Sequence, residues 1–363
     1  MHRRQFVLTL AGASAASLGS MHRASSATAQ TPSDVPTPPP ARSLSRGQDG
    51  SLVGSARPPG TLAPAITSND AFYIVTKNAA GDPNLDAATW RMVIDGEVNS
   101  AVQLDYQVLR ALPPVEITKT LECISNFTSQ CEQASFGCEL ISTAAWRGAR
   151  LSDVLSLAGG LTSNAAGLAV LSADEFSAGL PVDVITDPEA LLVYEMNGQV
   201  LPREHGYPAR LLVPGRYGMK NPKWVVGIRA TTQEYAGWYE QRNWNKDGIV
   251  HTMARVDVPA NNTGLTPGVQ PIAGIAYAGA RGIQMVEYSA DGGQTWQTAV
   301  LEAPLDRDTW VRWQGTFYLE PGSQAVLVAR ATDGSSATQT DAFSLPQPDG
   351  ATGWNSVSVQ ATA

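Results

Sequence analysis

Near its C-terminus the chain reads Val286-Glu287-Tyr288-Ser289-Ala290-Asp291-Gly292-Gly293-Gln294-Thr295-Trp296, which has the pattern of a β-hairpin. Apolar and aromatic positions flank Asp291-Gly292-Gly293, and Asp-Gly and Gly-Gly pairs favour the tight turns that join antiparallel strands. Further short strands are predicted on both sides, among them 283–288 and 325–331. Several short strands within about 100 residues are typical of an immunoglobulin-like sandwich, so we predict one over residues 256–363.

The region before this all-β part, residues 65–255, mixes strand and helix patterns. Strand patterns lie at 90–94, 191–194 and 209–213, and helical apolar spacing lies at 105–112 and 151–158. Ser152 or Asp153 is expected to cap the second helix. Regular βαβ alternation is absent, and no G-x-G-x-x-G follows a strand, so a dinucleotide-binding fold has no support. We therefore predict an α+β domain, mostly β, over residues 65–255.

The first 29 residues have the pattern of an export signal. His2-Arg3-Arg4-Gln5-Phe6-Val7 is a twin-arginine pattern, an apolar stretch follows it, and Ala27-Thr28-Ala29 fits the small-x-small rule for cleavage before Gln30. An ordinary secretory signal with a chance arginine pair is the alternative. Residues 30–64 are rich in Pro, Ser, Gly and Ala and are predicted to be an exposed linker. We thus expect a periplasmic or otherwise exported protein, with folded structure from about Thr67 onward.

The composition is that of a folded protein with two domains. Of the 363 residues, 43% are hydrophobic and 16% are charged, which suits sizeable cores. The formal net charge is -8 and no Lys/Arg block occurs, so nucleic acid is not expected as a partner. After the N-terminus, no apolar run reaches the ~20 residues that span a bilayer, so no membrane span is expected.

Three cysteines, Cys123, Cys131 and Cys138, lie in a chain expected in an oxidising compartment, and an odd number leaves one unpaired. For Cys131 and Cys138 two alternatives stay open, a small disulfide or two free thiols. No C-x-x-C or C-x-x-C-H motif occurs, so neither a zinc ribbon nor covalent haem is indicated. Two of the four histidines lie in the predicted signal, which argues against a His-rich metal site.

Two segments combine residue types that suit chemistry. In Thr120-Leu121-Glu122-Cys123-Ile124-Ser125-Asn126, a cysteine follows a predicted strand and could supply a thiolate to a soft metal; a buried, inert cysteine is the alternative. The second segment starts at His205-Gly206-Tyr207-Pro208-Ala209-Arg210 and ends at Lys223-Trp224. Its histidine, cations and glycines could hold a phosphate and a polar heterocycle, whereas a solvated basic loop is the alternative.

These two segments, in this order and with this separation, resemble the sulfite oxidase family of molybdopterin enzymes. The resemblance runs through most of the chain after the signal. It includes Trp146-Arg147-Gly148-Ala149-Arg150-Leu151, residues 187–198, residues 205–224, Asp291-Gly292-Gly293-Gln294-Thr295-Trp296 and Gly353-Trp354-Asn355.

The resemblance implies one molybdenum–molybdopterin cofactor (Moco), with Cys123 as the single protein sulfur on the metal, and oxidation by oxygen-atom transfer. It implies that His205 and Arg210 contact the pterin and its phosphate, and that Lys223 contacts the pyranopterin. The further expected cofactor contacts are Lys77, Asn78 and Asn126. It also implies that residues 65–255 bind the cofactor and that the immunoglobulin-like residues 256–363 form a dimerisation domain, so a homodimer is expected.

The sequence departs from the family where arginines would surround the substrate face of the metal. Lys77, Thr128 and Gln347 stand at those positions, and Trp244 stands where the family has a tyrosine. An indole donates one hydrogen bond but is no phenolic acid, and a lysine is a point charge without a planar fork. These differences predict a substrate that is different from sulfite, or a broader range of substrates.

Two other arginines, Arg216 and Arg242, are candidates to rebuild part of an anion site. The catalytic residues are accordingly predicted to be Cys123, Lys77, Trp244 and Arg242.

The sequence therefore predicts an exported molybdenum-cofactor oxidoreductase that oxidises a small substrate, sulfite or a related compound. The chain has no haem-attachment motif, so electrons are expected to leave to a separate acceptor, a c-type cytochrome, a membrane subunit or oxygen. The main alternative is a non-catalytic exported binding or adhesion protein with an immunoglobulin-like module. A family member that keeps the cofactor without turnover is a third reading.

Overall fold

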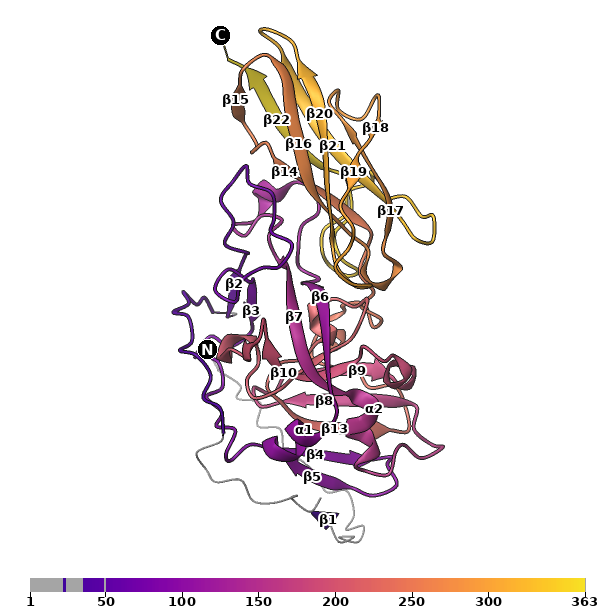
Figure 1. Cartoon of the computed structure of the whole chain (residues 1–363). Helices are drawn as coiled ribbons and strands as arrows, with labels where there is room; N and C mark the ends of the chain where they lie inside the picture. The colour runs from indigo at the N-terminus through magenta and orange to yellow at the C-terminus, as the bar shows by residue number, and fades with distance from the viewer. Residues whose placement is uncertain (1–21, 24–34, 49, 363) are drawn as a thin grey trace, which may run out of the picture.

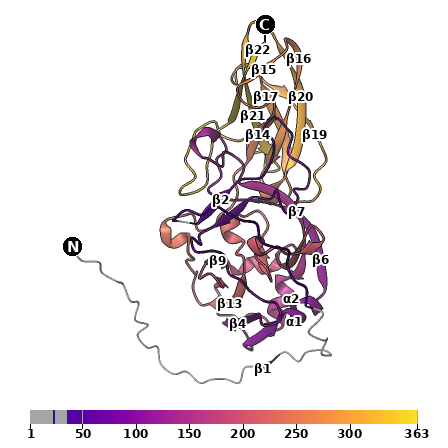
Figure 2. The ribbon, with the colours of Figure 1, turned by 90° about the vertical axis from the view of Figure 1, so that its left-hand side faces the viewer.

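The computed structural model describes residues 22–23, 35–48 and 50–362, which form two bodies arranged end to end (Figure 1). The first holds sheets, short helices and long loops, and the second is built of strands (Figure 2). Of the predicted export signal, only His22–Arg23 are described, as strand β1 beside β5; its arginine pair and cleavage site lie outside the described residues.

Two sheets build the first domain. One has the strand order β1-β5-β4-β13-β8-β9, and the other has the order β11-β10-β7-β6 with β12 beside β10. The first sheet is mixed, because β13 is parallel to β4 and antiparallel to β8. The strand bounds are β4 Arg91–Gly96, β5 Val102–Asp105, β6 Pro114–Glu122, β7 Ile141–Arg150, β8 Gly167–Ser172, β9 Ser177–Pro181, β10 Leu191–Met196, β11 Gln199–Val200, β12 Arg210–Leu212 and β13 Val225–Thr231.

The two α-helices of this domain lie where the apolar spacing predicted them. In α1 (Tyr106–Ala111) the carboxylate of Asp105 accepts the Val108 N–H at 3.0 Å and so caps the helix. In α2 (Leu151–Ser156) the N-cap is Arg150, which makes no side-chain cap bond. The prediction that Ser152 or Asp153 caps α2 is therefore wrong, because both residues lie inside the first turn of the helix.

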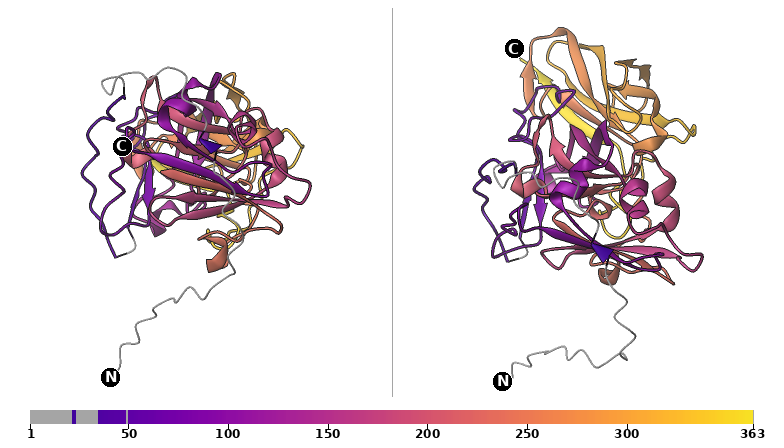
Figure 3. Two further views of the ribbon diagram at one scale, coloured as in Figure 1. Left: turned by 90° about the horizontal axis from the view of Figure 1, so that it is seen from below. Right: turned by 60° about the horizontal axis from the view of Figure 1, so that its bottom comes forward.

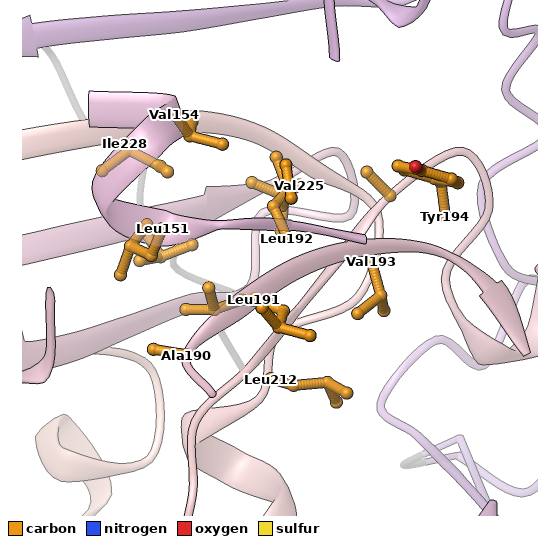
Figure 4. Packing of buried hydrophobic residues seen from close by; sticks show 14 of the residues in the cluster. Leu151, Val154, Ala190, Leu191, Leu192, Val193, Tyr194, Leu212, Val225 and Ile228 are labelled. Carbon is orange, nitrogen blue, oxygen red and sulfur yellow. The ribbon is translucent and has the colours of Figure 1, made fainter. Parts of the chain in front are cut away.

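Strand β10 runs through the centre of the first core, which explains its unbroken apolar sequence. Leu191, Leu192 and Val193 are fully buried in the cluster that also holds Leu151 of α2, Leu212 of β12 and Val225 of β13 (Figure 4). Burying such side chains stabilises the fold by about 1.5–3 kcal/mol each. The predicted buried strand at 191–194 is confirmed.

The second domain is a pair of facing sheets, with strand orders β14-β16-β20-β19 and β15-β22-β21-β17-β18 (Figure 3). The predicted hairpin is confirmed, because β17 and β18 pair antiparallel and Asp291 accepts the N–H groups of Gln294 and Thr295 in the turn. The strand bounds are β14 Met253–Val258, β15 Thr263–Leu265, β16 Gly268–Tyr277, β17 Ile283–Ser289, β18 Gln297–Thr298, β19 Val300–Leu301, β20 Val311–Leu319, β21 Gln324–Asp333 and β22 Asn355–Ala361.

The segment expected to be an exposed linker instead packs against both domains over residues 35–64. Strand β2 (Ser51–Val53) pairs with β3 (Ile74–Thr76), which lies in the first domain. Arg42 forms an ion pair with Glu204 at 3.4 Å, and Arg57 forms one with Asp257 at 3.3 Å. The linker prediction failed because composition does not show which distant carboxylates meet these arginines.

The two domains share a buried apolar contact beside the end of β6. Ile124 and Tyr217 of the first domain pack there with Tyr277 and Trp310 of the second. A buried ion pair between Lys119 on β6 and Asp308 crosses the same contact. Within the described residues, no helix is long and apolar enough to cross a membrane.

Candidate functional site

Cys123 follows the last residue of β6 and lines a cavity in the first domain. The side chain is buried, with 5% of its surface exposed, and its Sγ accepts the Ser125 N–H at 3.4 Å. Among the described cysteines it is the free one, because Cys131 and Cys138 form a disulfide. Burial raises the pKa of the Cys123 thiol to about 11, so without a bound cation it stays protonated.

The turn that carries Cys123 is held by Asn126. The Asn126 N–H donates to the Cys123 carbonyl at 2.9 Å, and its side chain joins the Glu122 carboxylate to the Leu140 N–H, each at 2.9 Å. Asn126 does not line the cavity. The residue expected to contact the cofactor thus instead fixes the shape of the cysteine turn.

Three residues of basic type, His205, Arg210 and Lys223, line the same cavity. His205 ends a 3-10 turn (Arg203–His205), Arg210 begins β12, and Lys223 precedes β13. Gly206 lets them converge: its φ is +116°, and a Cβ there would lie 3.0 Å from the Cβ atoms of both Arg210 and Lys223. The structure therefore brings together all three residues of the predicted pterin and phosphate site.

Arg210 is buried, and the structure offers its guanidinium no carboxylate within the described residues. It donates to the carbonyls of His205 and Asn221, each at 3.1 Å, while its Nε is buried without a partner. Burial lowers the pKa of Arg210 to about 10. A buried cation with backbone acceptors and an unpaired N–H is a site that an anion would complete.

Lys223 adds a second buried cation, and the charges of Lys223 and Arg210 both act on His205. The Lys223 ammonium donates to the carbonyls of Val75 at 3.0 Å and Glu204 at 2.8 Å, and burial lowers its pKa to about 8. Burial, followed by the charges of Lys223 and Arg210, lowers the pKa of His205 well below its usual value, so its imidazole is neutral. A phosphate and a polar heterocycle fit this donor set.

The donor set therefore fits a molybdopterin. Its phosphate would find Arg210 and Lys223, its ring would find the neutral His205, and the metal would find the Cys123 thiol in the same cavity. A soft metal favours a thiolate, and coordination deprotonates the thiol that burial alone keeps protonated.

Two tyrosines line the cavity that sequence reasoning did not select, Tyr73 and Tyr239. A Cβ built on Gly218 would lie 3.1 Å from the Tyr73 hydroxyl and 3.8 Å from the Cys123 Cα, so this phenol lies next to the cysteine. Burial, and then the neighbouring Cys123, raises the pKa of both tyrosines. Tyr239 lies in the same sequence segment as Trp244. Treating every tyrosine of that segment as a candidate would have identified Tyr239.

Trp244 and Arg242 lie behind this wall. The Trp244 ring packs edge-on against Tyr239, with 5.6 Å between ring centroids, and does not line the cavity. Arg242 is exposed, stacks 3.7 Å from the centre of the Trp238 ring and donates to the Trp238 carbonyl at 2.8 Å. Gln347 donates to the Arg242 carbonyl at 3.1 Å.

Lys77 lines the cavity, whereas Asn78 does not. The Lys77 ammonium donates to the Asp174 carbonyl at 2.5 Å and lies 3.8 Å from the Asp174 carboxylate. Asn78 donates to Asp174 at 3.1 Å and to Asp82 at 3.2 Å. The Asn78 side chain thus links the carboxylates of Asp82 and Asp174, and Lys77 pairs with Asp174.

The remaining two candidate positions lie away from the cavity wall. Thr128 is buried with an unpaired hydroxyl and is not among the lining residues. Arg216 donates to the Asp247 carbonyl. Neither residue rebuilds an anion site in the cavity.

The second domain holds the loop that follows Cys123. The Asn355 side chain lies 3.2 Å from the Cys131 sulfur, and Arg255 donates to the Cys138 carbonyl at 2.5 Å. The Asp308 carbonyl accepts the Thr120 N–H at 2.9 Å, three residues before Cys123. The disulfide, one of the two alternatives left open, therefore closes a loop that docks on the second domain.

Comparisons with known proteins agree with this donor set. Residues 79–239 match the family described as oxidoreductase molybdopterin binding domain, and residues 245–357 match the Mo-co oxidoreductase dimerisation domain. Mitochondrial sulfite oxidase of Homo sapiens is 33% identical over 334 residues, which cover 79% of this chain and 60% of that protein. Sulfite oxidase of Gallus gallus is 30% identical over 361 residues, which cover 86% of this chain and 78% of that protein.

A solved structure has the same fold. The sulfane dehydrogenase SoxCD from Paracoccus pantotrophus superposes with a TM-score of 0.69 at 24% identity, covering 77% of this chain and 76% of that one. The chain spans about 60% of the length of the mammalian relatives. Both matched domains, and the extent of the likeness to the avian enzyme, place this chain in the sulfite oxidase family of molybdopterin-dependent oxidoreductases.

Proposed function

We propose that this protein is an exported molybdenum-cofactor oxidoreductase that oxidises a small substrate and passes the electrons to a separate acceptor. The observation that carries the proposal is the presence of the buried Cys123 thiol in one cavity with Arg210 and Lys223. A binding or adhesion module has no use for a buried guanidinium left without an anion, so that alternative is not favoured.

The cofactor supplies oxygen-atom transfer and two-electron redox chemistry when bound. The chain's own residues position and tune it: Cys123 gives the metal a thiolate, and Arg210 and Lys223 neutralise the phosphate. His205, held neutral, would hydrogen-bond the ring without adding charge. Cys123, His205 and Arg210 are buried, and burial strengthens electrostatic contacts with a bound group.

Three further parts of the proposal concern the rest of the molecule. The twin-arginine pattern supports export of a folded, loaded protein to the periplasm. The match to a dimerisation domain supports a homodimer through the immunoglobulin-like second domain. A c-type cytochrome suits the role of acceptor, because the chain has no haem-attachment motif of its own.

Substrate-dependent reduction of ferricyanide or of a c-type cytochrome, measured on protein purified from a host that makes the cofactor, tests the proposal. We expect turnover with sulfite or a related sulfur compound in the wild type, and loss of turnover in Cys123→Ala. Arg307→Ala, far from the cavity, is the matched control and should retain the wild-type rate. A molybdenum-loaded wild type that reduces neither acceptor with any such compound would refute catalysis.

A further inference from the structure

An arginine near the N-terminus contacts the backbone and side chains behind the cavity wall. The N-terminal arm (residues 35–48 and 50–64) precedes every described residue that lines the cavity. The guanidinium of Arg42, in this arm, donates to the Asp70 and Phe72 carbonyls, the second at 2.6 Å. Its Nε lies 3.4 Å from the Glu204 carboxylate. Arg42 does not line the cavity, yet it joins residues 69–72 to the distant turn Arg203–His205.

His205 belongs to one of the stretches that Arg42 joins and contacts the other. Its ring packs edge-on against Phe72, with 5.2 Å between ring centroids, and its Nε2 lies 3.4 Å from the Asn69 carbonyl. Phe72 and His205 both line the cavity. The position of the imidazole therefore depends on how residues 69–72 and the turn Arg203–His205 are held together.

Glu204 depends on Arg42 for its charge balance. Its side chain is 5% exposed, and Arg42 is the one cation that pairs with its carboxylate among the described residues. The second carboxylate oxygen, Oε2, is buried without a partner. Loss of one member of a buried pair leaves an uncompensated charge, so without Arg42 the turn must move or take up a proton. The Glu204 carbonyl also accepts the Lys223 ammonium at 2.8 Å, so a displaced turn would disturb Lys223 as well as His205.

The other arginines of the arm have partners outside the cavity wall. Arg46 pairs with Asp82 at 3.0 Å, and Arg57 pairs with Glu139 and, at 3.3 Å, with Asp257. None of these three carboxylates lines the cavity. Among the arginines of the described arm, Arg42 is therefore the one whose partners belong to the cavity wall.

We propose that Arg42 is a positioning residue for the molybdopterin. Its guanidinium clamps the turn Arg203–His205 against residues 69–72, and so holds His205 and the Lys223 ammonium where the cofactor contacts them. The inference rests on the proposed function, from which those two cofactor contacts come. An arginine suits this role because its planar fork reaches three acceptors at once, whereas a lysine ammonium is a single point charge.

Retention of the cofactor tests the clamp. Wild type, Arg42→Met and Arg42→Lys are purified from a host that makes the cofactor and dialysed, and the molybdenum and pterin left on the protein are measured over time. We expect both variants to lose the pterin at least about 10-fold faster than the wild type, the effect of about one misplaced charge-assisted contact. A folded variant purified without any pterin would show the same defect in full. Wild-type retention in Arg42→Lys would mean that charge alone suffices, and would overturn the clamp.

Arg57→Met is the matched control, because it removes ion pairs of the same arm away from the cavity wall. Thermal unfolding of the cofactor-free proteins measures the stability that each variant loses. Arg57→Met should be destabilised as Arg42→Met is, but it should retain pterin like the wild type. Pterin loss from Arg42→Met no faster than from Arg57→Met would overturn the inference and leave the proposed oxidoreductase standing. A wild type without molybdenum or pterin would overturn the proposed function, and this inference with it.

Discussion

Replacing Lys119 by methionine should destabilise the whole protein. Its ion-pair partner, Asp308, lies far away in the sequence. Lys119 is fully buried and Asp308 is 2% exposed, so the substitution leaves a carboxylate in the domain contact without its cation. Asp308 would keep only the Tyr277 hydroxyl at 2.8 Å and the Gly215 N–H at 2.8 Å. Breaking a buried pair from one side costs about 3–5 kcal/mol. At about 2 °C per kcal/mol for a chain of this size, Tm should fall by about 6–10 °C.

Thermal unfolding of the cofactor-free protein by circular dichroism measures this change. Arg307→Ala is the matched control, because Arg307 pairs with Asp187 and Glu189 at the surface with 44% of its side chain exposed. A surface pair of this kind is worth about 0.2–1 kcal/mol, so its Tm should change by no more than about 2 °C. If Lys119→Met lowers Tm no more than Arg307→Ala does, the buried ion pair does not stabilise the contact between the domains.

Three more outcomes follow from the site. Cys131→Ser removes the cross-link of a short loop and should lower the free energy of unfolding, measured by urea titration, by about 2.5 kcal/mol. A free-thiol count confirms that Cys138 is then reduced. An unchanged free energy of unfolding would contradict a formed disulfide. Lys223 has its pKa lowered to about 8, so between about pH 8 and 10.5 this group binds fewer protons in the folded cofactor-free protein than in the unfolded chain. The free energy of unfolding of the wild type relative to Lys223→Met should therefore rise by up to about 3 kcal/mol over this range, and a difference that does not change with pH would contradict the lowered pKa. Arg210→Met should retain a folded protein with at least about 10-fold weaker pterin retention on dialysis, and full retention would mean that the phosphate lies elsewhere.

The sequence was most informative where local pattern and chemistry agree. Both faces of β10 are covered in the folded protein, so its residues 191–194 are all apolar. This unbroken apolar run is what predicts a buried strand. The sequence predicts that His205, Arg210 and Lys223 share one site because an anionic cofactor needs cations, and Gly206 lets these residues approach one another in the folded chain. In both cases, residues close in sequence are also close in space.

The sequence was least informative where distant segments meet. Arg42 and Arg57 hold residues 35–64 against the two domains, but their carboxylate partners lie more than 80 residues away. Tyr73 reaches the Cys123 turn from another part of the chain, so spacing alone could not place it. Asn126 was assigned to the cofactor, yet its amide satisfies Glu122 and Leu140, a role that only the folded turn defines.

The central claim is that Cys123 holds the metal of a molybdenum–pterin cofactor. It is tested most directly by metal and pterin analysis of wild type and Cys123→Ser, both purified from a cofactor-competent host, together with the molybdenum electron paramagnetic resonance spectrum. We expect near-equimolar molybdenum and pterin in the wild type, and lost molybdenum or a spectrum without the thiolate signature in the variant. Wild-type protein without molybdenum or pterin, or a variant with the unchanged wild-type spectrum, would contradict the account.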